Sequence, residues 1–258
     1  MRVALGVSYR GTRFHGWQSQ PSGRGIQDHL QQALARVAGG AVTVVAAGRT
    51  DTGVHAQGQV VHFDPFVERP LTAWVRGTNA FLDRDVAVNW AVPVGPDFHA
   101  RHSATSRSYQ YWLYNAPVRP SVLDGLVGWI HTPLEIERMQ DAARALTGEH
   151  DFTSFRSAHC QARSPVRELT RCDVESRGNY VRFALTANGF LHHMVRNIVG
   201  ALIYVGSGRL PVSAMLDLLE ARDRRTAPPT FSPDGLCLTR VGYPAPIDLP
   251  QPDPLPWP

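Results

Sequence analysis

The spacing of apolar residues in the first hundred positions is the feature that most constrains the fold. It predicts strands and helices in the order β-α-β-β-α-β. Ile26, Leu30 and Leu34 recur at helical spacing, and the β-branched run 42–47 is typical of a strand. The expected segments are 3–9, 26–37, 42–47, 58–64, 71–82 and 85–94.

The second half repeats this order loosely. Its clearest helix spans 133–147, where Thr132 and Glu135 form a predicted capping box and Gly148 ends the helix. The other expected segments are strands at 107–115, 168–176, 179–187 and 236–243, and helices at 190–205 and 212–222. We therefore expect an α+β fold of two tandem ferredoxin-like domains, whose antiparallel sheets form a central cleft.

These patterns set the expected domain limits. The first domain is 1–104 and the second is 105–245, with the boundary near 97–106. The proline-rich tail, 246–258, follows and is expected to run extended over the surface, because proline excludes a helix there.

All 26 basic residues are arginine, which excludes several chemistries. Without lysine the chain forms no Schiff base, so enzymes that use pyridoxal phosphate and imine-forming aldolases are ruled out. The lysine of a P-loop is missing too. With 22 carboxylates the formal charge is 26 − 22 = +4, which permits an acidic partner such as nucleic acid without requiring one.

The three cysteines are widely separated, in neither a metal-ligand spacing nor a disulfide framework. They favour a reducing compartment. The N-terminus has no signal-peptide pattern, and the apolar stretch 194–205 is too short and polar to cross a bilayer. We expect a cytoplasmic protein without a membrane partner.

The loop 47–57 is the first candidate site, because it joins two expected strands and is longer than a hairpin needs. Asp51 lies two residues after Arg49 and two before Gly53. Asp51 is either a turn residue that caps backbone N–H groups, a catalytic carboxylate, or half of a metal site with His55.

The second candidate is 188–197. Arg196 lies inside the apolar run 194–202, where a charge is costly unless it is paired, and Asp51 is a reasonable partner. Alternatively, Arg196 extends to solvent or pairs locally. His192 and His193 are more typical of a helix start than of a metal site.

Some aromatic and basic residues are compatible with nucleic-acid binding. Tyr109 and Tyr111 share one face of an expected strand, and one of these rings could stack on a base. Six arginines between 156 and 182 form either a solvated face or a phosphate track. Arg101 and Arg107 flank the expected domain boundary.

Taken together, several motifs resemble those of the tRNA pseudouridine synthase A family, in order and over residues 1 to about 245. The segment Gly48-Arg49-Thr50-Asp51-Thr52-Gly53-Val54-His55-Ala56 is similar to the family's catalytic motif. The others are Phe14 to Gln20 with Ile26-Gln27, Phe98-His99-Ala100-Arg101, Arg107 to Tyr111, Asp151 to Arg156, His192 to Asn197 and Gly235 to Leu238. Thr52, where alanine is common in the family, and the proline-rich tail depart from its pattern.

The resemblance implies an isomerase that converts uridine to pseudouridine at positions 38, 39 and 40 of the tRNA anticodon arm, after the base is flipped. It implies Asp51 as the catalytic carboxylate, Arg196 as its partner and Tyr109 as the ring that stacks on uracil. Leu236 would line the pocket and Arg49 would assist base flipping. The implied tRNA-contacting residues are Arg69, Phe98, His99, Ala100, Arg101, His102, His159, Cys160, Gln161, Ala162 and Arg163.

The same resemblance implies a homodimer that needs no metal and no cofactor. The chemistry agrees, because uracil is detached from C1′ and rejoined through C5 with no net redox change. A carboxylate near C1′ is needed, as in glycoside chemistry. Whether it attacks C1′, attacks the base or abstracts a ribose proton stays open. An RNA-binding module without catalysis is the main alternative; a metal hydrolase using His55, His192 and His193 is the weakest.

Overall fold

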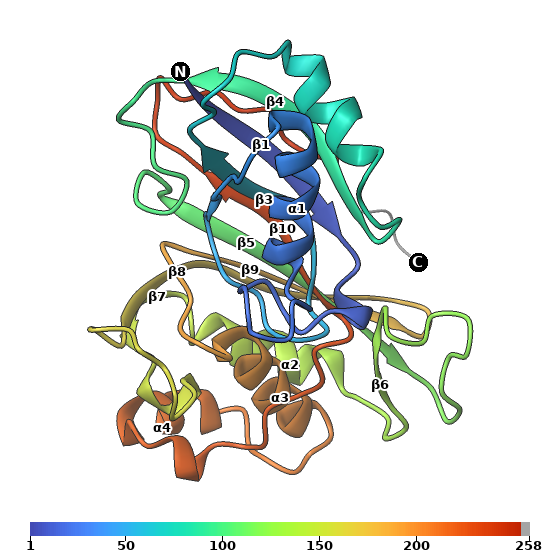
Figure 1. Cartoon of the computed structure of the whole chain (residues 1–258). Coiled ribbons are helices and arrows are strands. Elements are labelled where there is room, and N and C mark those ends of the chain that lie inside the picture. Colours follow the sequence, from blue (N-terminus) through green and yellow to red (C-terminus); the bar gives the residue numbers. More distant parts are fainter. Residues whose placement is uncertain (254–258) are drawn as a thin grey trace. The chain divides into compact units, whose positions relative to one another are not determined.

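The computed structural model describes residues 1–253, and the chain divides into two compact units (Figure 1). Unit 1 contains residues 1–105 together with the described residues from 237 onward; unit 2 contains 106–236. The α+β class expected from the sequence is confirmed. None of the described helices is long and apolar enough to cross a membrane.

Unit 1 is built on one sheet with the strand order β4-β1-β3-β10, and the short strand β2 also pairs with β3. All of these pairs are antiparallel except β10 with β3. The elements are β1 (Arg2–Tyr9), α1 (Ile26–Ala38), β2 (Val45–Ala46), β3 (His55–Phe63), a π-helical segment (Ala73–Gly77), β4 (Val86–Val94) and β10 (Leu236–Gly242).

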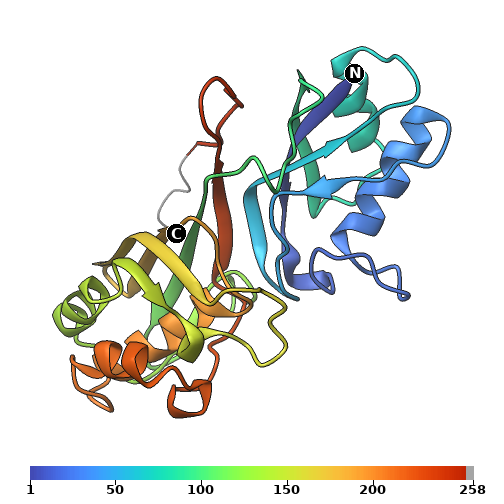
Figure 2. The ribbon, with the colours of Figure 1, turned by 90° about the vertical axis from the view of Figure 1, so that its left-hand side faces the viewer.

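The apolar stripe of α1 was predicted correctly. Ile26, Leu30 and Leu34 are fully buried, and Gly39 ends the helix with φ of 77°. Figure 2 shows α1 and the π-helical segment on the same side of the unit 1 sheet. That face supplies the core of unit 1.

The last strand lies in a different unit from the one expected. The sequence pattern assigns residues up to 245 to the second domain, but Cys237 and Leu238 pair with His55 and Ala56 on β3 of unit 1. Pairing across a sheet joins segments distant in sequence, and the periodicity of a single strand carries no sign of its partner.

Two segments of unit 1 are shorter or less regular than expected. The strand predicted at 42–47 is reduced to β2. The Gln31 side chain accepts the N–H of Val44 (3.0 Å), and Gln27 donates to the Val44 carbonyl (3.3 Å). Side chains of α1 thus take the bonds that a strand partner would make. The helix predicted at 71–82 contains the π-helical segment.

In unit 2 the strands follow the order β5-β9-β8-β7, and β6 pairs in parallel with β5. Helices α2 and α3 pack against each other, and α2 packs against β8. The elements are β5 (Ser106–Asn115), β6 (Gly128–Ile130), α2 (Ile136–Arg144), β7 (Gly148–Asp151), β8 (Val166–Arg177), β9 (Tyr180–Ala187), α3 (Met194–Gly206) and α4 (Ala214–Ala221).

The predicted capping box at Thr132 does not form. The Asn115 side chain donates to the Thr132 carbonyl (2.7 Å) and accepts the N–H of Leu134 (3.2 Å), so the chain stays extended and Glu135 is the N-cap. Gly148 begins β7, a strand the sequence did not predict, as it did not predict β6.

Helix α3 begins later than the predicted residue 190. His193 adopts a left-handed conformation with φ of 65°, and the regular helix starts at Met194. Gly200 and Gly206 allow close packing on this helix, because a Cβ would lie 2.7 Å from the Pro229 carbonyl and about 2.4 Å from the Met139 sulfur, respectively.

Candidate functional site

The loop that carries Asp51, between β2 and β3, is fixed by hydrogen bonds to the residue before it. Thr50 is buried, and its hydroxyl shares a 2.8 Å hydrogen bond with the Tyr9 hydroxyl. The Thr50 carbonyl accepts the N–H of Trp17 at 3.0 Å. The Gln59 side chain donates to the Gly48 carbonyl at 2.8 Å. These bonds therefore hold both Thr50, the residue before Asp51, and Gly48, at the start of the loop.

Two glycines let the N-terminal segment approach this loop. Gly16 has φ of 81°, and a Cβ there would lie 2.7 Å from the Thr50 carbonyl. A Cβ on Gly11 would lie 2.0 Å from the Val54 carbonyl. A side chain at either position would displace the loop, so this N-terminal motif supports the Asp51 loop.

The predicted residues of the loop differ in exposure. Asp51 is half-buried, its carbonyl accepts the N–H of Val54 (3.1 Å), and Arg49 is exposed. His55 is buried, and its Nδ1 accepts the N–H of Gly11 at 3.0 Å. This bond gives His55 a role in anchoring the loop and argues against its use as a metal ligand through Nδ1.

In unit 2, Arg196 lies on the first turn of α3 and is half-buried. Its Nε donates to the Phe231 carbonyl at 2.8 Å, and the Phe231 N–H returns a 3.3 Å bond to the Arg196 carbonyl. The guanidinium is thereby oriented by the backbone of the 229–235 loop.

Tyr109 and Tyr111 both lie on β5, but their environments differ. Tyr109 is 9% exposed, and its ring meets that of Phe190 edge to face at 5.1 Å. Tyr111 is fully buried and donates from its hydroxyl to the Ser232 carbonyl at 3.0 Å. Burial raises the pKa of Tyr111, so this phenol stays protonated and structural. Of the two rings, Tyr109 has the greater access to a ligand.

Leu236, the predicted pocket residue, is buried at the start of β10. Its N–H bonds to the Pro233 carbonyl at 2.9 Å. The preceding Gly235 permits a close backbone contact, because a Cβ there would lie 2.0 Å from the Trp112 carbonyl. This contact fixes where Leu236 begins its strand.

Sequence reasoning assigned no role to Asn197, although it is a buried hub. Its Nδ2 donates to the Phe155 carbonyl at 2.7 Å, and its Oδ1 accepts from Thr230 (2.7 Å) and Arg224 (3.2 Å). Asn197 thus ties three segments to the helix that carries Arg196. A polar amide within an apolar run was the available signal.

The residues expected to contact RNA fall into two groups. Phe98 and Ala100 are buried, His99 is half-buried, and Cys160 and Ala162 are partly covered. The exposed members are Arg69, Arg101, His102, His159, Gln161 and Arg163. The side chains of the second group are the more accessible to a ligand.

Four of the six arginines between 156 and 182 differ in the groups that they contact. Arg171 and Arg182 form ion pairs with Asp173 and Glu175, each at 2.5 Å. Arg156 and Arg167 instead donate to backbone carbonyls, those of Cys160 (3.1 Å) and Ser164 (3.0 Å). Arg171 and Arg182 are thus paired with neighbouring carboxylates, and the phosphate track stays a prediction.

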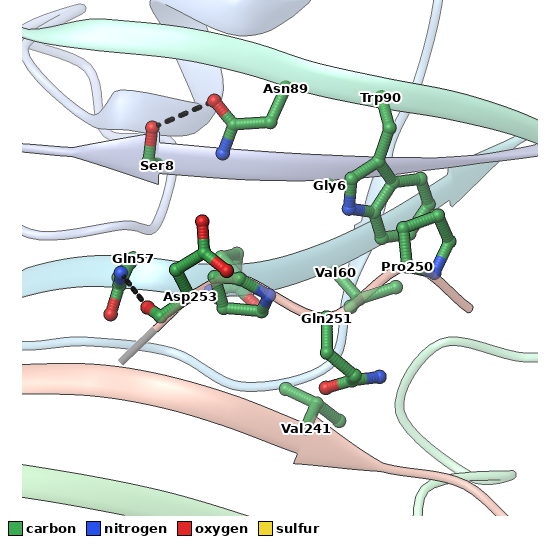
Figure 3. Close-up of a pocket in the computed structure, with 13 residues that line it drawn as sticks. Gly6, Ser8, Gln57, Val60, Asn89, Trp90, Val241, Pro250, Gln251 and Asp253 are labelled. Atoms are coloured by element: carbon green, nitrogen blue, oxygen red, sulfur yellow. Dashed lines mark hydrogen bonds between the residues drawn. The ribbon is translucent and has the colours of Figure 1, made fainter. Parts of the chain in front are cut away.

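A cavity of about 380 Å³ lies in unit 1 beneath the described part of the tail (Figure 3). Strands β1, β3, β4 and β10 line it, and Pro250 faces the Trp90 ring. Gln57 donates to the Asp253 carbonyl at 2.5 Å. None of the predicted catalytic residues lines this cavity, which is where the chain's own tail docks. Residues 254–258 of the predicted tail lie outside the described residues.

Comparison with known proteins adds the family. A family model described as tRNA pseudouridine synthase matches residues 6–103 and 142–244. The chain is 58% identical over 252 residues to tRNA pseudouridine synthase A of Chromobacterium violaceum, covering 97% of this chain and 96% of that one. It is 56% identical to the protein of that name from Methylobacillus flagellatus, covering 94% and 93%. The chain belongs to the tRNA pseudouridine synthase family, which confirms the resemblance.

Proposed function

We propose that this protein converts uridines 38, 39 and 40 in the anticodon arm of tRNA to pseudouridine, with Asp51 as the catalytic carboxylate. Isomerisation of uridine in tRNA follows from membership in the family. One observation supports the finer assignment. The Asp51 loop is fixed through Tyr9, Trp17 and Gln59 while Asp51 itself remains half-buried. A carboxylate that is held in place but not sealed in the core suits a reacting group.

The reaction requires a carboxylate that stays charged beside C1′. We assign Arg196 as the guanidinium that favours this charged form. The bond from its Nε to the Phe231 carbonyl supports the role, because it fixes the plane of a guanidinium group, whose geometry suits a fork with a carboxylate. Lysine, which the chain lacks, has no such geometry.

The target base must leave its stack, at a cost of a few kcal/mol. We assign Tyr109 as the ring that stacks on the flipped uracil, which would return about 1–3 kcal/mol. Its edge-to-face contact with Phe190 fixes the ring plane in advance. Arg49, an exposed residue, would fill the space the base leaves, and Leu236 would give the pocket an apolar wall.

The tRNA backbone would be held by the exposed residues Arg69, Arg101, His102, His159, Gln161 and Arg163. Phe98, His99, Ala100, Cys160 and Ala162 would shape these segments. We propose a cytoplasmic homodimer, and the free thiols of Cys160, Cys172 and Cys237 agree with a reducing compartment. We propose a ferredoxin-like fold for each unit. The order of unit 1, which runs strand, helix, strand, strand, helical segment, strand before β10 is added, supports this fold for that unit.

Tritium release from C5-labelled uridine in unmodified tRNA tests the proposal, because C5 loses its hydrogen when it bonds to C1′. Asp51→Asn should bind tRNA and release no tritium, whereas Asp248→Asn, at an exposed position, should behave as the wild type. Normal release by Asp51→Asn would refute the role of Asp51. Binding without release by the wild-type protein would favour a non-catalytic RNA-binding module.

A further inference from the structure

In unit 1, the turn 98–103 is bound through the imidazole rings of two histidines. The Nδ1 of His62, on β3, accepts the N–H of Ala100 at 3.0 Å. The Nδ1 of His99 accepts the N–H groups of Arg101 (3.2 Å) and His102 (3.1 Å). Three consecutive backbone donors are therefore satisfied by imidazole nitrogens.

The carbonyl side of the turn is anchored as well. Arg2 donates to the Phe98 carbonyl at 2.7 Å, and the Tyr243 hydroxyl donates to the Ala100 carbonyl at 2.8 Å. Ser103 donates its N–H to the His99 carbonyl (2.9 Å) and accepts the His99 N–H through its hydroxyl (3.0 Å). Every backbone N–H of the turn and the carbonyls of Phe98, His99 and Ala100 thus have a hydrogen-bond partner.

The acceptor role requires both rings to be neutral at Nδ1. His62 is 4% exposed, and burial lowers its pKa to about 4; Arg2 and His99 lower it further, while Asp64 opposes them. Burial lowers the pKa of His99 too, followed by His102 and Arg2. The ring centroids lie 4.9 Å apart for His62 and His99, and 4.2 Å for His99 and His102. Adjacent imidazoles at these distances disfavour a second positive charge.

We propose that His62 and His99 are positioning residues for RNA recognition, because they fix the turn from which Arg101 and His102 extend toward the tRNA backbone. The inference rests on the proposed function, which assigns this segment to tRNA. Arg101 and His102 are exposed, whereas Phe98 and Ala100 are buried. Fixing the backbone beforehand reduces the entropy lost when a guanidinium binds phosphate.

Paired substitutions separate this role from general stability. Asparagine places an oxygen near the position of the imidazole Nδ1 and can accept the same backbone N–H groups. Glutamine carries its oxygen one bond further out, where it cannot. His99→Asn should therefore keep the turn, and His99→Gln should lose it. His99 is half-buried, so neither substitution opens a cavity in the core, and we expect both variants to fold.

The measurement is tRNA affinity over a salt series, together with kcat and KM for the full chain. For His99→Gln we expect a three- to tenfold rise in Kd and KM, an unchanged kcat and a salt slope smaller by about one, as when one phosphate contact is lost. His99→Asn should stay within twofold of the wild type. Hydrogen exchange at the Arg101 and His102 amides should rise in His99→Gln alone. His62→Asn and His62→Gln should show the same contrast.

Arg101→Ala distinguishes an error in the proposed RNA contact from an error in the positioning role. If it binds tRNA with wild-type affinity and salt slope, the assigned RNA contact is wrong and the proposed function loses that element. If Arg101→Ala is weakened but His99→Gln binds like the wild type, the contact stands and the positioning role is overturned. Equal losses for His99→Asn and His99→Gln would also overturn it, because the acceptor would then be irrelevant.

Discussion

The Tyr9 hydroxyl lies 2.8 Å from the hydroxyl of Thr50, the residue immediately before Asp51. Both groups are buried, so the hydrogen bond is not exchanged for one with water. This contact connects the first strand directly to the loop that carries the proposed catalytic carboxylate. It makes the geometry of Asp51 sensitive to a residue that does not touch the substrate in our proposal.

Tyr9→Phe removes that bond, together with the 3.4 Å bond from the Gln59 side chain to the Tyr9 hydroxyl, and keeps the ring. We expect a loss of about 1 kcal/mol in the free energy of unfolding, because the Thr50 hydroxyl is left without its partner. We also expect kcat to fall about tenfold, which corresponds to about 1.4 kcal/mol in the barrier. Single-turnover tritium release and urea unfolding measure the two effects. Tyr114→Phe, whose ring packs on Tyr180, is the matched control. Unchanged turnover in Tyr9→Phe would show that loop order does not limit the reaction.

Gly16→Ala tests the close approach of the N-terminal segment. Its Cβ would meet the Thr50 carbonyl at 2.7 Å, at a backbone φ of 81°. We expect about 1–3 kcal/mol of destabilisation and a larger relative loss of kcat than of tRNA affinity. Gly23→Ala is a sharp control, because Gly23 has a similar φ of 66° with open space around it. If both variants lose the same activity, the conformational penalty alone is responsible and contact with the loop is not.

Arg196→Lys keeps the charge and loses the planar fork. Lysine has no Nε–H to donate to the Phe231 carbonyl while also reaching a carboxylate. We expect kcat to fall by about 10²–10³ with little change in tRNA affinity, the size of effect seen when a preorganised charge-stabilising donor is lost. Arg209→Lys, at an arginine that lies over the Tyr204 ring, should remain active. Near-normal kcat in Arg196→Lys would exclude an essential bidentate contact.

The buried His62 predicts how stability depends on pH. Unfolded histidine titrates near 6.5, whereas burial lowers the pKa of folded His62 to about 4. As the pH falls, His62 of the unfolded state binds a proton before His62 of the folded state does. The free energy of unfolding therefore decreases between pH 6.5 and about 4. Hydrogen exchange of the β3 amides between pH 7 and 4.5 measures the loss. His62→Asn should have a flatter dependence, and parallel curves for the two proteins would contradict the assignment.

The sequence pattern predicted correctly those elements that depend on interactions between residues close in sequence. The stripe of Ile26, Leu30 and Leu34 predicted α1 because the burial of one helix face repeats every 3.6 residues. The short β2 and the absent capping box were missed for a shared reason. In both places a side chain distant in sequence, Gln31 or Asn115, takes the backbone hydrogen bonds. A single sequence holds no record of such partners.

The candidate site shows the same division. The residue types around Asp51 and Arg196 indicated their importance, and the family resemblance supplied roles for them. The residue types and the family resemblance gave no sign that Asn197 bonds to several segments or that Tyr9 holds the Asp51 loop. Both residues act through contacts that form only on folding. The sequence did not indicate the burial of Phe98 and Ala100 either, and in our proposal these residues shape the turn.

The parallel pairing of β10 with β3 has a consequence for synthesis on the ribosome. Residues 1–105 emerge first, but the strand that covers part of the β3 edge is translated after all of unit 2. Until then the nascent sheet exposes unpaired backbone groups, a known template for aggregation. Unit 2, a continuous segment, is free to mature before unit 1 is complete. Because translation proceeds from the N-terminus, the sheet of unit 1 is completed only after unit 2 has been synthesised. A chain that ends before residue 237 would lack β10, and the sheet of unit 1 would stay incomplete.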